Sequence, residues 1–387
     1  MRVALVHDYI KEYGGAERVL EALHEIWPDA PVFTTVYLPE FLGPHKTRFK
    51  NWNIKTSFLQ HLPFKSKLIS PFRLIAPFMF KTFDFSQFDI VIVSATGAYV
   101  KNFKFQISNF KFPKRPVYIY YCHTPPRYLY GYATAREWKN NLVLRVFGEI
   151  ANHFLRLVDF KSSQNVDFFI ANSKNVAGRI SKFYRKDSVV IYPPVDSASS
   201  SSAFSIQLKN KKLDANSLDA RRYFVAGGRI ARPKHIDLIV ETFKKLDLPL
   251  KVFGREFGGI RSEKLEVRSS NIEFLGEVSD EEKLELMKGA KAFVFAAENE
   301  DFGITPVEAM SVGTPVIAYK SGGVLETIVD EKTGIFYHFN DLNHLSEAIH
   351  KFEKIKFDRE EIAKYAQRFS KERFKKEIKE FVESKVK

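Results

Sequence analysis

The chain has 387 residues, of which 45% are hydrophobic and 27% charged, and its formal net charge is +14. This length suits two or three domains, and this composition excludes an intrinsically disordered chain. Cys122 is the single cysteine, so no intrachain disulfide can form, as suits a reducing compartment. The first strand-like residues run into Asp8 and Glu12 without a cleavage-like site, and no apolar run reaches the roughly 18–20 residues that span a bilayer. We therefore expect neither a secretory signal nor a transmembrane helix.

The positive charge is concentrated in the first half of the chain. Residues 1–190 carry about +13 and residues 191–387 about +1, and residues 41–130 alone carry about +12. This asymmetry indicates an anionic partner, which is nucleic acid, acidic lipid or a phosphate-bearing substrate. The alternative is a solvated basic face that keeps the protein soluble.

A strand, a glycine turn and a helix open the chain. Residues 2–10 form an aliphatic and β-branched run, Gly14 and Gly15 form a turn, and residues 16–26 place apolar side chains on one helical face. Further short apolar runs follow at residues 31–37, 89–95, 116–122, 166–173 and 188–195. Their alternation with helix-like segments is the βαβ cadence of a doubly wound α/β domain.

The same cadence restarts after a serine-rich segment. The serine run after Asp196 and the polar residues that follow predict a linker at 196–220. Beyond it we expect strands at 223–230, 249–254, 271–276, 291–297 and 315–320, and helices at 236–246, 280–288, around 306–312, 341–354 and 358–387. The sequence thus predicts Rossmann-like domains at 1–195 and 221–365, and a C-terminal helix at 366–387 that could pack back on the first domain. Strand-end loops of two such domains would line a cleft between them.

Two glycine-containing loops follow predicted strands and suit a phosphate group. Gly14 and Gly15 precede a helix whose first N–H groups favour an anion, although a plain turn is the alternative. In the segment GGRIARPKH, Arg229 and Lys234 make a clamp for a diphosphate, although two surface cations are the alternative. Neither a G-x-G-x-x-G fingerprint nor a G-x-x-x-x-G-K-[ST] loop occurs at these positions.

The segment ENEDFGITPVEAM brackets a predicted strand-to-helix turn with two carboxylates. Glu300 lies in the turn, where it could accept hydrogen bonds from sugar hydroxyls, and Glu308 lies one turn into the helix, where it could accept them from a ribose diol. Gly303, Ile304 and Thr305 would offer N–H groups at the helix N-terminus. The alternative is an acidic first turn favoured by the helix dipole.

His123 follows the strand at 116–122, within YYCHTPPRYLY. A histidine there could donate to a hydroxyl or a phosphate, and a structural histidine is the alternative. Cys122 and His123 are not expected to form a nucleophile pair, because adjacent strand residues point to opposite faces. The ten histidines include no H-E-x-x-H or H-x-H spacing, so no metal site is expected.

Together these segments resemble the retaining glycosyltransferases of family 4, or glycosyl transferases group 1. The most specific element is the E-x7-E signature with an internal Phe-Gly, here Glu300 to Glu308, continuing as EAMSVGTPVIA and SGGVLETI. GGAE at 14–17 and GGR…K at 227–234 precede it in the order of the family. The segments HDYIKEYGGAERV, YCHTPPRYLY and IYPPVD resemble a mannosyltransferase-like branch. The resemblance implies the GT-B fold, in which two Rossmann-like α/β domains face each other across a cleft, with C-terminal helices.

The resemblance also implies a role for each matching position. Arg229 and Lys234 would neutralise the departing diphosphate, Glu300 would hold the sugar and Glu308 the ribose. His123 would lie near the anomeric centre. The remaining donor-binding positions are Gly14 and Gly15 at the diphosphate or sugar, the backbone of Phe302, Gly303, Ile304 and Thr305 at the sugar and phosphate, and Gly254, Arg255 and Val278 around the base.

The family needs neither a metal nor a cofactor, and it retains the anomeric configuration. No carboxylate nucleophile stands out on the opposite wall, so we expect a same-face reaction in which the departing phosphate helps deprotonate the acceptor. Two departures occur in this sequence. His235 follows Lys234 where the family usually has glycine, and Glu298 and Asp301 crowd Glu300, so that spacing alone selects Glu300.

By resemblance we expect transfer of a hexose, with mannose from GDP-mannose favoured, from a nucleotide sugar to a lipid-linked or polysaccharide acceptor in cell-envelope glycan synthesis. Lysines interleaved with phenylalanines at 46–52, 64–83 and 100–105 suit shallow docking on anionic lipid. We therefore expect a cytoplasmic protein, peripheral on the inner face of the cytoplasmic membrane; core packing of these phenylalanines is the alternative. Rival interpretations are another GT-B enzyme (a UDP-sugar transferase, an epimerase or a phosphorylase), an inactive scaffold, or a nucleic-acid-binding protein. Nucleic acid is not the expected partner, because no helix-turn-helix or aromatic RNA-binding pattern occurs.

Overall fold

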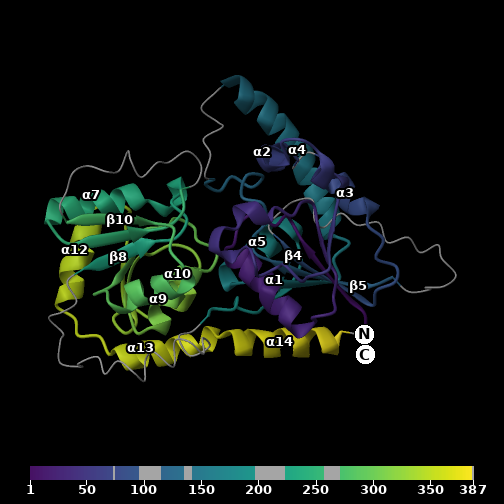
Figure 1. Cartoon of the computed structure of the whole chain (residues 1–387). Coiled ribbons are helices and arrows are strands. Elements are labelled where there is room, and N and C mark those ends of the chain that lie inside the picture. The colour runs from purple at the N-terminus through teal and green to yellow at the C-terminus, as the bar shows by residue number, and fades with distance from the viewer. Residues whose placement is uncertain (73–74, 96–114, 135–141, 197–222, 257–270, 386–387) are drawn as a thin grey trace. The chain divides into compact units, whose positions relative to one another are not determined.

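The computed structural model describes residues 1–72, 75–95, 115–134, 142–196, 223–256 and 271–385. The chain divides into two compact units (Figure 1). Unit 1 comprises residues 1–132, 138–194 and 372–387, and unit 2 comprises residues 133–137 and 195–371. The predicted linker at 196–220 lies outside the described residues except for Asp196, and so does the Lys/Phe segment at 100–105.

Unit 1 is built on a seven-stranded parallel sheet with the order β3-β2-β1-β4-β5-β6-β7. Its strands are β1 (Val3–His7), β2 (Val32–Thr34), β3 (Ile54–Thr56), β4 (Ile90–Ala95), β5 (Val117–Cys122), β6 (Phe168–Ala171) and β7 (Ser188–Val190). The central strands are buried on both faces, which is why they read as continuous apolar runs.

Helices cover both faces of this sheet. They are α1 (Gly15–Ile26), α2 (Lys65–Phe72), α3 (Ala76–Met79), α4 (Leu142–Ser163), α5 (Lys174–Tyr184) and α14 (Lys371–Ser384), with short 3-10 turns η1 (Pro39–Phe41), η2 (Gly43–His45), η3 (Phe58–His61) and η4 (Phe80–Thr82). Side chains of β1 alternate between two cores, because successive strand residues point to opposite faces. Leu5 packs in the core that α1 and α14 cover, and Val6 packs in the core that α5 covers.

Unit 2 contains a six-stranded parallel sheet with the order β10-β9-β8-β11-β12-β13. Its strands are β8 (Phe224–Gly227), β9 (Leu250–Phe253), β10 (Ile272–Gly276), β11 (Phe293–Phe295), β12 (Val316–Tyr319) and β13 (Gly334–Tyr337). Its helices are α7 (Ile236–Leu246), α9 (Asp280–Lys288), α10 (Ile304–Ser311), α11 (Val324–Thr327), α12 (Leu342–Glu353) and α13 (Arg359–Ala366), with 3-10 turns η7 (Arg232–Lys234) and η8 (Gln367–Phe369). Residues of α7 and α12 fill the core on one face of this sheet.

The prediction of two Rossmann-like α/β domains is confirmed. Both sheets are entirely parallel, and the segments that follow their strands supply the loops discussed below. Two strands were not predicted, β3 and β13. The first has the partly exposed sequence Ile-Lys-Thr and the second begins at Gly334, so neither stands out as an apolar run. The predicted helix at 358–387 is divided into α13, η8 and α14. Among the described residues, no helix has both the length and the apolar character that crossing a bilayer demands.

Candidate functional site

Two predicted site residues of unit 2 contact each other directly. The ammonium Nζ of Lys234 donates to Oε2 of Glu300 at 2.6 Å, and both side chains are largely buried. Lys234 ends the 3-10 turn η7 after β8, and Glu300 lies in the loop after β11. Lys234 also lies over the ring of Phe295, with Nζ 5.1 Å from the ring centroid. Arg229 is exposed on the same loop as Lys234. A cation and an acid 66 residues apart in sequence thus meet at the carboxyl ends of two adjacent strands.

Backbone contacts join the same two loops. The amide of Glu298 donates to the carbonyl of Pro233 at 2.9 Å. Gly228, with φ of +112°, lies so close to the other loop that a Cβ built on it would be 3.6 Å from Oγ1 of Thr305. Gly303 has φ of +93° and forms the N-cap of α10, so the chain enters this helix through a conformation that favours glycine. The N-terminus of α10 therefore lies beside the loop of Gly228 and Lys234 and directly follows the loop of Glu300.

A pocket of 260 Å³ opens beside these loops, at the ends of β8, β9 and β10. It is lined by Ile230, Val252, Gly254, Arg255, Glu256, Phe274, Gly276 and Glu277. Gly254 has φ of +137°, and a Cβ built there would overlap the carbonyl oxygen of Gly228. Gly254 and Arg255, two of the three positions expected around a base, line this pocket. The third position, Val278, is not among the lining residues, although its neighbour Glu277 is.

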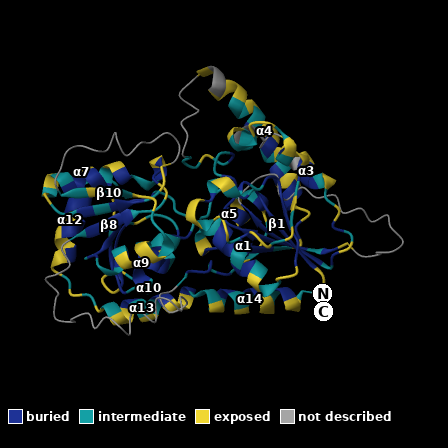
Figure 2. Cartoon of the chain, in the orientation of Figure 1, coloured by how far each residue is buried: buried dark blue, intermediate teal, exposed yellow. Residues whose placement is uncertain are grey.

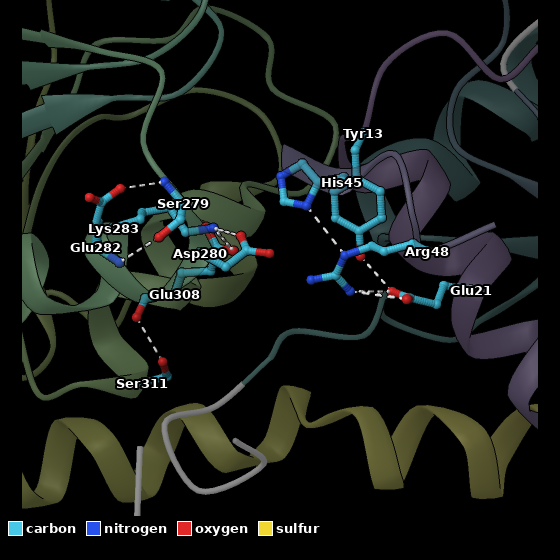
Figure 3. Close-up of polar contacts among 10 residues, drawn as sticks. All are labelled: Tyr13, Glu21, His45, Arg48, Ser279, Asp280, Glu282, Lys283, Glu308 and Ser311. Carbon is cyan, nitrogen blue, oxygen red and sulfur yellow. Dashed lines mark hydrogen bonds and ion pairs between the residues drawn. The ribbon is translucent and has the colours of Figure 1, made fainter. Parts of the chain in front are cut away.

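Glu308 is buried and ion-paired (Figure 3). Nζ of Lys283 lies 2.7 Å from Oε1 of Glu308 and 2.9 Å from Oδ1 of Asp280, and only 4% of the Glu308 side chain is exposed. Lys283 lies in the first turn of α9. Ser279 and Glu282 form a capping box at the N-terminus of this helix. The lysine compensates the negative charge of a buried acid.

In unit 1 the Gly14–Gly15 turn is fastened by Glu17. Oε2 of Glu17 accepts the amide of Gly14 at 2.9 Å, which completes the N-cap of α1. The amide of Gly14 is therefore occupied in the structure. Oε1 of Glu17 lies 3.5 Å from Nε2 of His7, whose Nδ1 donates to the carbonyl of Ser94 at 2.6 Å. Burial alone would lower the pKa of His7, but the hydrogen bond and charge of Glu17, aided by Asp8 and the Ser94 carbonyl, raise it overall.

His123 adjoins this network at the end of β5. Its Nε2 is 2.9 Å from Oγ of Ser94, and its ring packs edge-on against Tyr121. Burial, with a smaller contribution from the charge of His7, lowers the pKa of His123 to about 3. His123 is thus a neutral imidazole at physiological pH, suited to hydrogen bonding rather than to carrying a charge.

A second cluster in unit 1 fixes the residue before the Gly14 turn (Figure 3). The hydroxyl of Tyr13 donates to Glu21, to which Nη1 of Arg48 also donates at 3.0 Å and 3.1 Å. The ring of Tyr13 stacks on His45, with centroids 4.3 Å apart. Tyr13 is therefore held at its hydroxyl and at its ring, and the glycine turn begins from a fixed point.

Two family profiles match the sequence. The profile "Glycosyltransferase Family 4" matches residues 13–199, and the profile "Glycosyl transferases group 1" matches residues 209–369. The chain belongs to the family 4 glycosyltransferases. Its membership confirms the resemblance drawn from the E-x7-E signature and from the segments around Gly14 and Lys234.

Curated relatives of this glycosyltransferase include two proteins named alpha-1,3/1,6-mannosyltransferase ALG2. The one from Dictyostelium discoideum is 24% identical over 67% of this chain and 66% of its own length. The one from Mus musculus is 26% identical over 69% of this chain and 65% of its own length. The chain thus spans slightly less than two thirds of these relatives.

Solved structures resemble the glycosyltransferase along its whole length. Sucrose-phosphate synthase from Thermosynechococcus elongatus has a TM-score of 0.70 at 16% identity and covers 99% of each chain. Anabaena HepE, crystallised with UDP and glucose, has a TM-score of 0.65 at 18% identity and covers 99% of this chain and 100% of its own. These likenesses confirm the GT-B fold that the sequence predicted.

Several polar residues of the glycosyltransferase sites were not predicted. His7, Ser94 and Glu17 join His123 to the Gly14 turn, and Lys283 with Asp280 joins Glu308. The strand-end position of His7 was a usable signal in sequence. Lys283 gave none, because 25 residues separate it from Glu308. In the described part of the chain, no three His, Cys, Asp or Glu residues gather as metal ligands would.

Proposed function

We propose that this protein transfers a mannosyl residue from GDP-mannose, with retention of configuration, to a lipid-linked or polysaccharide acceptor in cell-envelope glycan synthesis. The contact between Lys234 and Glu300 carries the proposal. In it, the cation assigned to the diphosphate and the acid assigned to the sugar hydroxyls hold each other in place. A nucleotide sugar would exchange this single ion pair for two charge-assisted contacts, one to its phosphate and one to its hydroxyls.

The choice of mannose and guanine has two supports. ALG2 relatives are named mannosyltransferases. The pocket at the ends of β8–β10 is lined by Glu256 and Glu277. Guanine presents two neighbouring N–H donors on one edge, which a single carboxylate can accept together. Uracil presents one N–H donor between two carbonyl oxygens. A carboxylate placed at that edge would be repelled by these two oxygens. An acidic pocket therefore favours the guanine base.

In the proposed reaction the bond between the sugar C1 and the diphosphate oxygen breaks while the acceptor oxygen attacks the same face. The acceptor proton passes to the departing phosphate. Charge accumulates on the leaving group, and Arg229, Lys234 and the first amides of α10 stabilise it electrostatically, without a metal. His123, neutral and buried beside Ser94, would hydrogen-bond a sugar hydroxyl.

Donor specificity and stereochemistry test this proposal. Purified protein would be incubated with GDP-mannose, UDP-glucose or UDP-galactose and a lipid-linked acceptor, with and without EDTA, and the product anomer read by NMR. We expect a retained mannoside from GDP-mannose alone, at a rate that EDTA leaves unchanged. Lys234→Met should lower kcat/KM by about 100-fold or more, as for a lost oxyanion donor.

The matched control is Lys332→Met, which removes an exposed lysine from a turn elsewhere in unit 2. Equal losses in the two variants would contradict the role of Lys234. A product made from a UDP-sugar but not from GDP-mannose would overturn the donor assignment. An inverted anomer would overturn the retaining mechanism.

A further inference from the structure

Helix α4 exposes a continuous apolar stripe. Seven side chains of this helix have exposed fractions from 38% to 73%. They are Leu142, Val146, Phe147, Ile150, Phe154, Leu157 and Phe160. At 100° per residue they fall within an arc of about 140° around the helix. Figure 2 shows exposed residues along α4, which extends from the top of unit 1. Contiguous apolar patches of this kind on soluble proteins mark sites of interaction with a membrane or a partner.

The opposite face of α4 is turned inward and carries mainly polar side chains, together with Leu155, which packs against Leu129. Asp159 is fully buried and accepts the hydroxyl of Tyr130 at 2.7 Å. Nη1 of Arg156 donates to the carbonyl of Leu129 at 3.1 Å. A helix that packs on a core ordinarily buries its apolar side and exposes its polar side. In α4 this arrangement is inverted, so the apolar stripe is not the face by which the helix is held in the fold.

The surroundings of α4 are basic and carry further exposed aromatic rings. Phe64 precedes α2 and Phe78 lies in α3, and they are exposed by 74% and 58%; Figure 1 draws both helices at the same end of unit 1 as α4. The segment 64–83 contains four basic residues, and none of its twenty residues is acidic. On α4 itself, Arg145 is exposed about 60° beyond the edge of the arc. Apolar side chains edged by cations are the composition of an interfacial helix.

We propose that the apolar face of α4 is the surface by which this protein docks on an anionic membrane, with α4 lying in the plane of the lipid headgroups. Charge complementarity favours a membrane over a second copy of the chain. Lys65, Lys67 and Lys81 belong to the segment 64–83, which has no acidic residue, so two copies meeting here would bring like charges together, whereas acidic lipid attracts them. This inference rests on the proposed function in one respect: a lipid-linked acceptor would be held at the membrane on which α4 docks.

The surface differs in part from the one that the sequence suggested. Phe49 and Phe80 of the interleaved Lys/Phe segments are core residues, exposed by 1% or less, so the alternative of core packing holds for them. Phe64 and Phe78 do reach solvent. The strongest apolar surface, α4, lies outside the three segments named from sequence.

Vesicle sedimentation of the full chain tests the proposal. The vesicles would be phosphatidylcholine with 30% phosphatidylglycerol, or phosphatidylcholine alone, at low salt. We expect wild type to sediment with the acidic vesicles, and the double variant Phe147→Ser/Phe154→Ser to bind at least tenfold more weakly. Phe339→Ser is the matched control, because Phe339 of unit 2 is exposed by 62%, as Phe154 is, and should bind like wild type.

A second measurement does not depend on loss of binding. Phe147→Trp should gain fluorescence on mixing with the vesicles, and lipids brominated on their acyl chains should quench it. Wild type that stays in the supernatant, or equal binding by the double variant, would overturn the proposal. So would a dimer of wild type that the double variant converts to a monomer, since the face would then belong to a second copy. Protein that binds through α4 but transfers no mannose to the lipid-linked acceptor would leave this surface standing and overturn only the proposed function.

Discussion

The buried pair between Lys283 and Glu308 makes a quantitative prediction. Lys283→Met removes the ammonium 2.7 Å from a carboxylate that is 4% exposed. Breaking such a pair from one side costs about 3–5 kcal/mol, because a buried carboxylate loses its counterion. We therefore expect a loss of about 3 kcal/mol at pH 7, the lower end of this range.

Calorimetry of the full chain would measure this loss in the transition of unit 2. For a domain of 150–250 residues, about 3 kcal/mol lowers Tm by roughly 6–12 °C. Lys283→Arg keeps the charge and is the matched control. The double variant Lys283→Met/Glu308→Gln removes both charges and should recover much of the loss at pH 7. The reasoning fails if Lys283→Met has the same Tm as Lys283→Arg at pH 7, or if the double variant is less stable than the lysine variant alone.

Three further predictions concern single positions. Gly254→Ala places a methyl group onto the Gly228 carbonyl at a φ of +137°, so donor binding by isothermal calorimetry should be lost while the far-UV circular dichroism is kept; normal affinity would contradict the tight packing of these loops. His235 has φ of +48°, a conformation that costs a non-glycine residue about 1–2 kcal/mol, so His235→Gly should raise the urea midpoint, and a lower midpoint would refute this account of the strain. Because the pKa of His123 is lowered to about 3 from 6.5, the unfolded chain binds the extra proton between these values, and folding stability falls as pH drops through this window. His123→Gln should therefore lose less stability than wild type between pH 6.5 and 4 in urea titrations, and parallel pH profiles would contradict the neutral buried ring.

The fold was predictable from sequence wherever long apolar runs alternate with glycine turns. β1, the turn at Gly14 and α1 follow directly from such a run, because buried parallel strands need apolar side chains on both faces. Loops after strands were also predictable as site positions, since parallel strands end at one edge of a sheet. The contact of Lys234 with Glu300 follows from this rule once β8 and β11 are adjacent.

Other features depend on packing that no local pattern encodes. The pairing of Lys283 with Glu308 requires α9 and α10 to lie side by side. The interleaved lysines and phenylalanines suggested a surface, but Phe49 and Phe80 are core residues. The sequence pattern is the same whether a phenylalanine between lysines points into the core or into solvent. The stripe on α4 was overlooked because an apolar helix face is ordinarily the one that packs inward. The stripe can be recognised as a solvent-facing surface only because the structure places Asp159 on the buried side of the helix.

Unit 1 is assembled from three separate stretches of chain, and its helix α14 follows unit 2 in the sequence. Phe374, Ile378 and Val382 of α14 complete the core beside α1, yet they leave the ribosome after all of unit 2. At 5–20 residues per second, the nascent unit 1 would wait roughly 10–40 s for this helix, with one apolar face of its sheet covered by α1 but not yet by α14. During this interval the exposed apolar surface would be open to aggregation or to chaperone binding, while most of unit 2, the stretch 195–371, has already been translated.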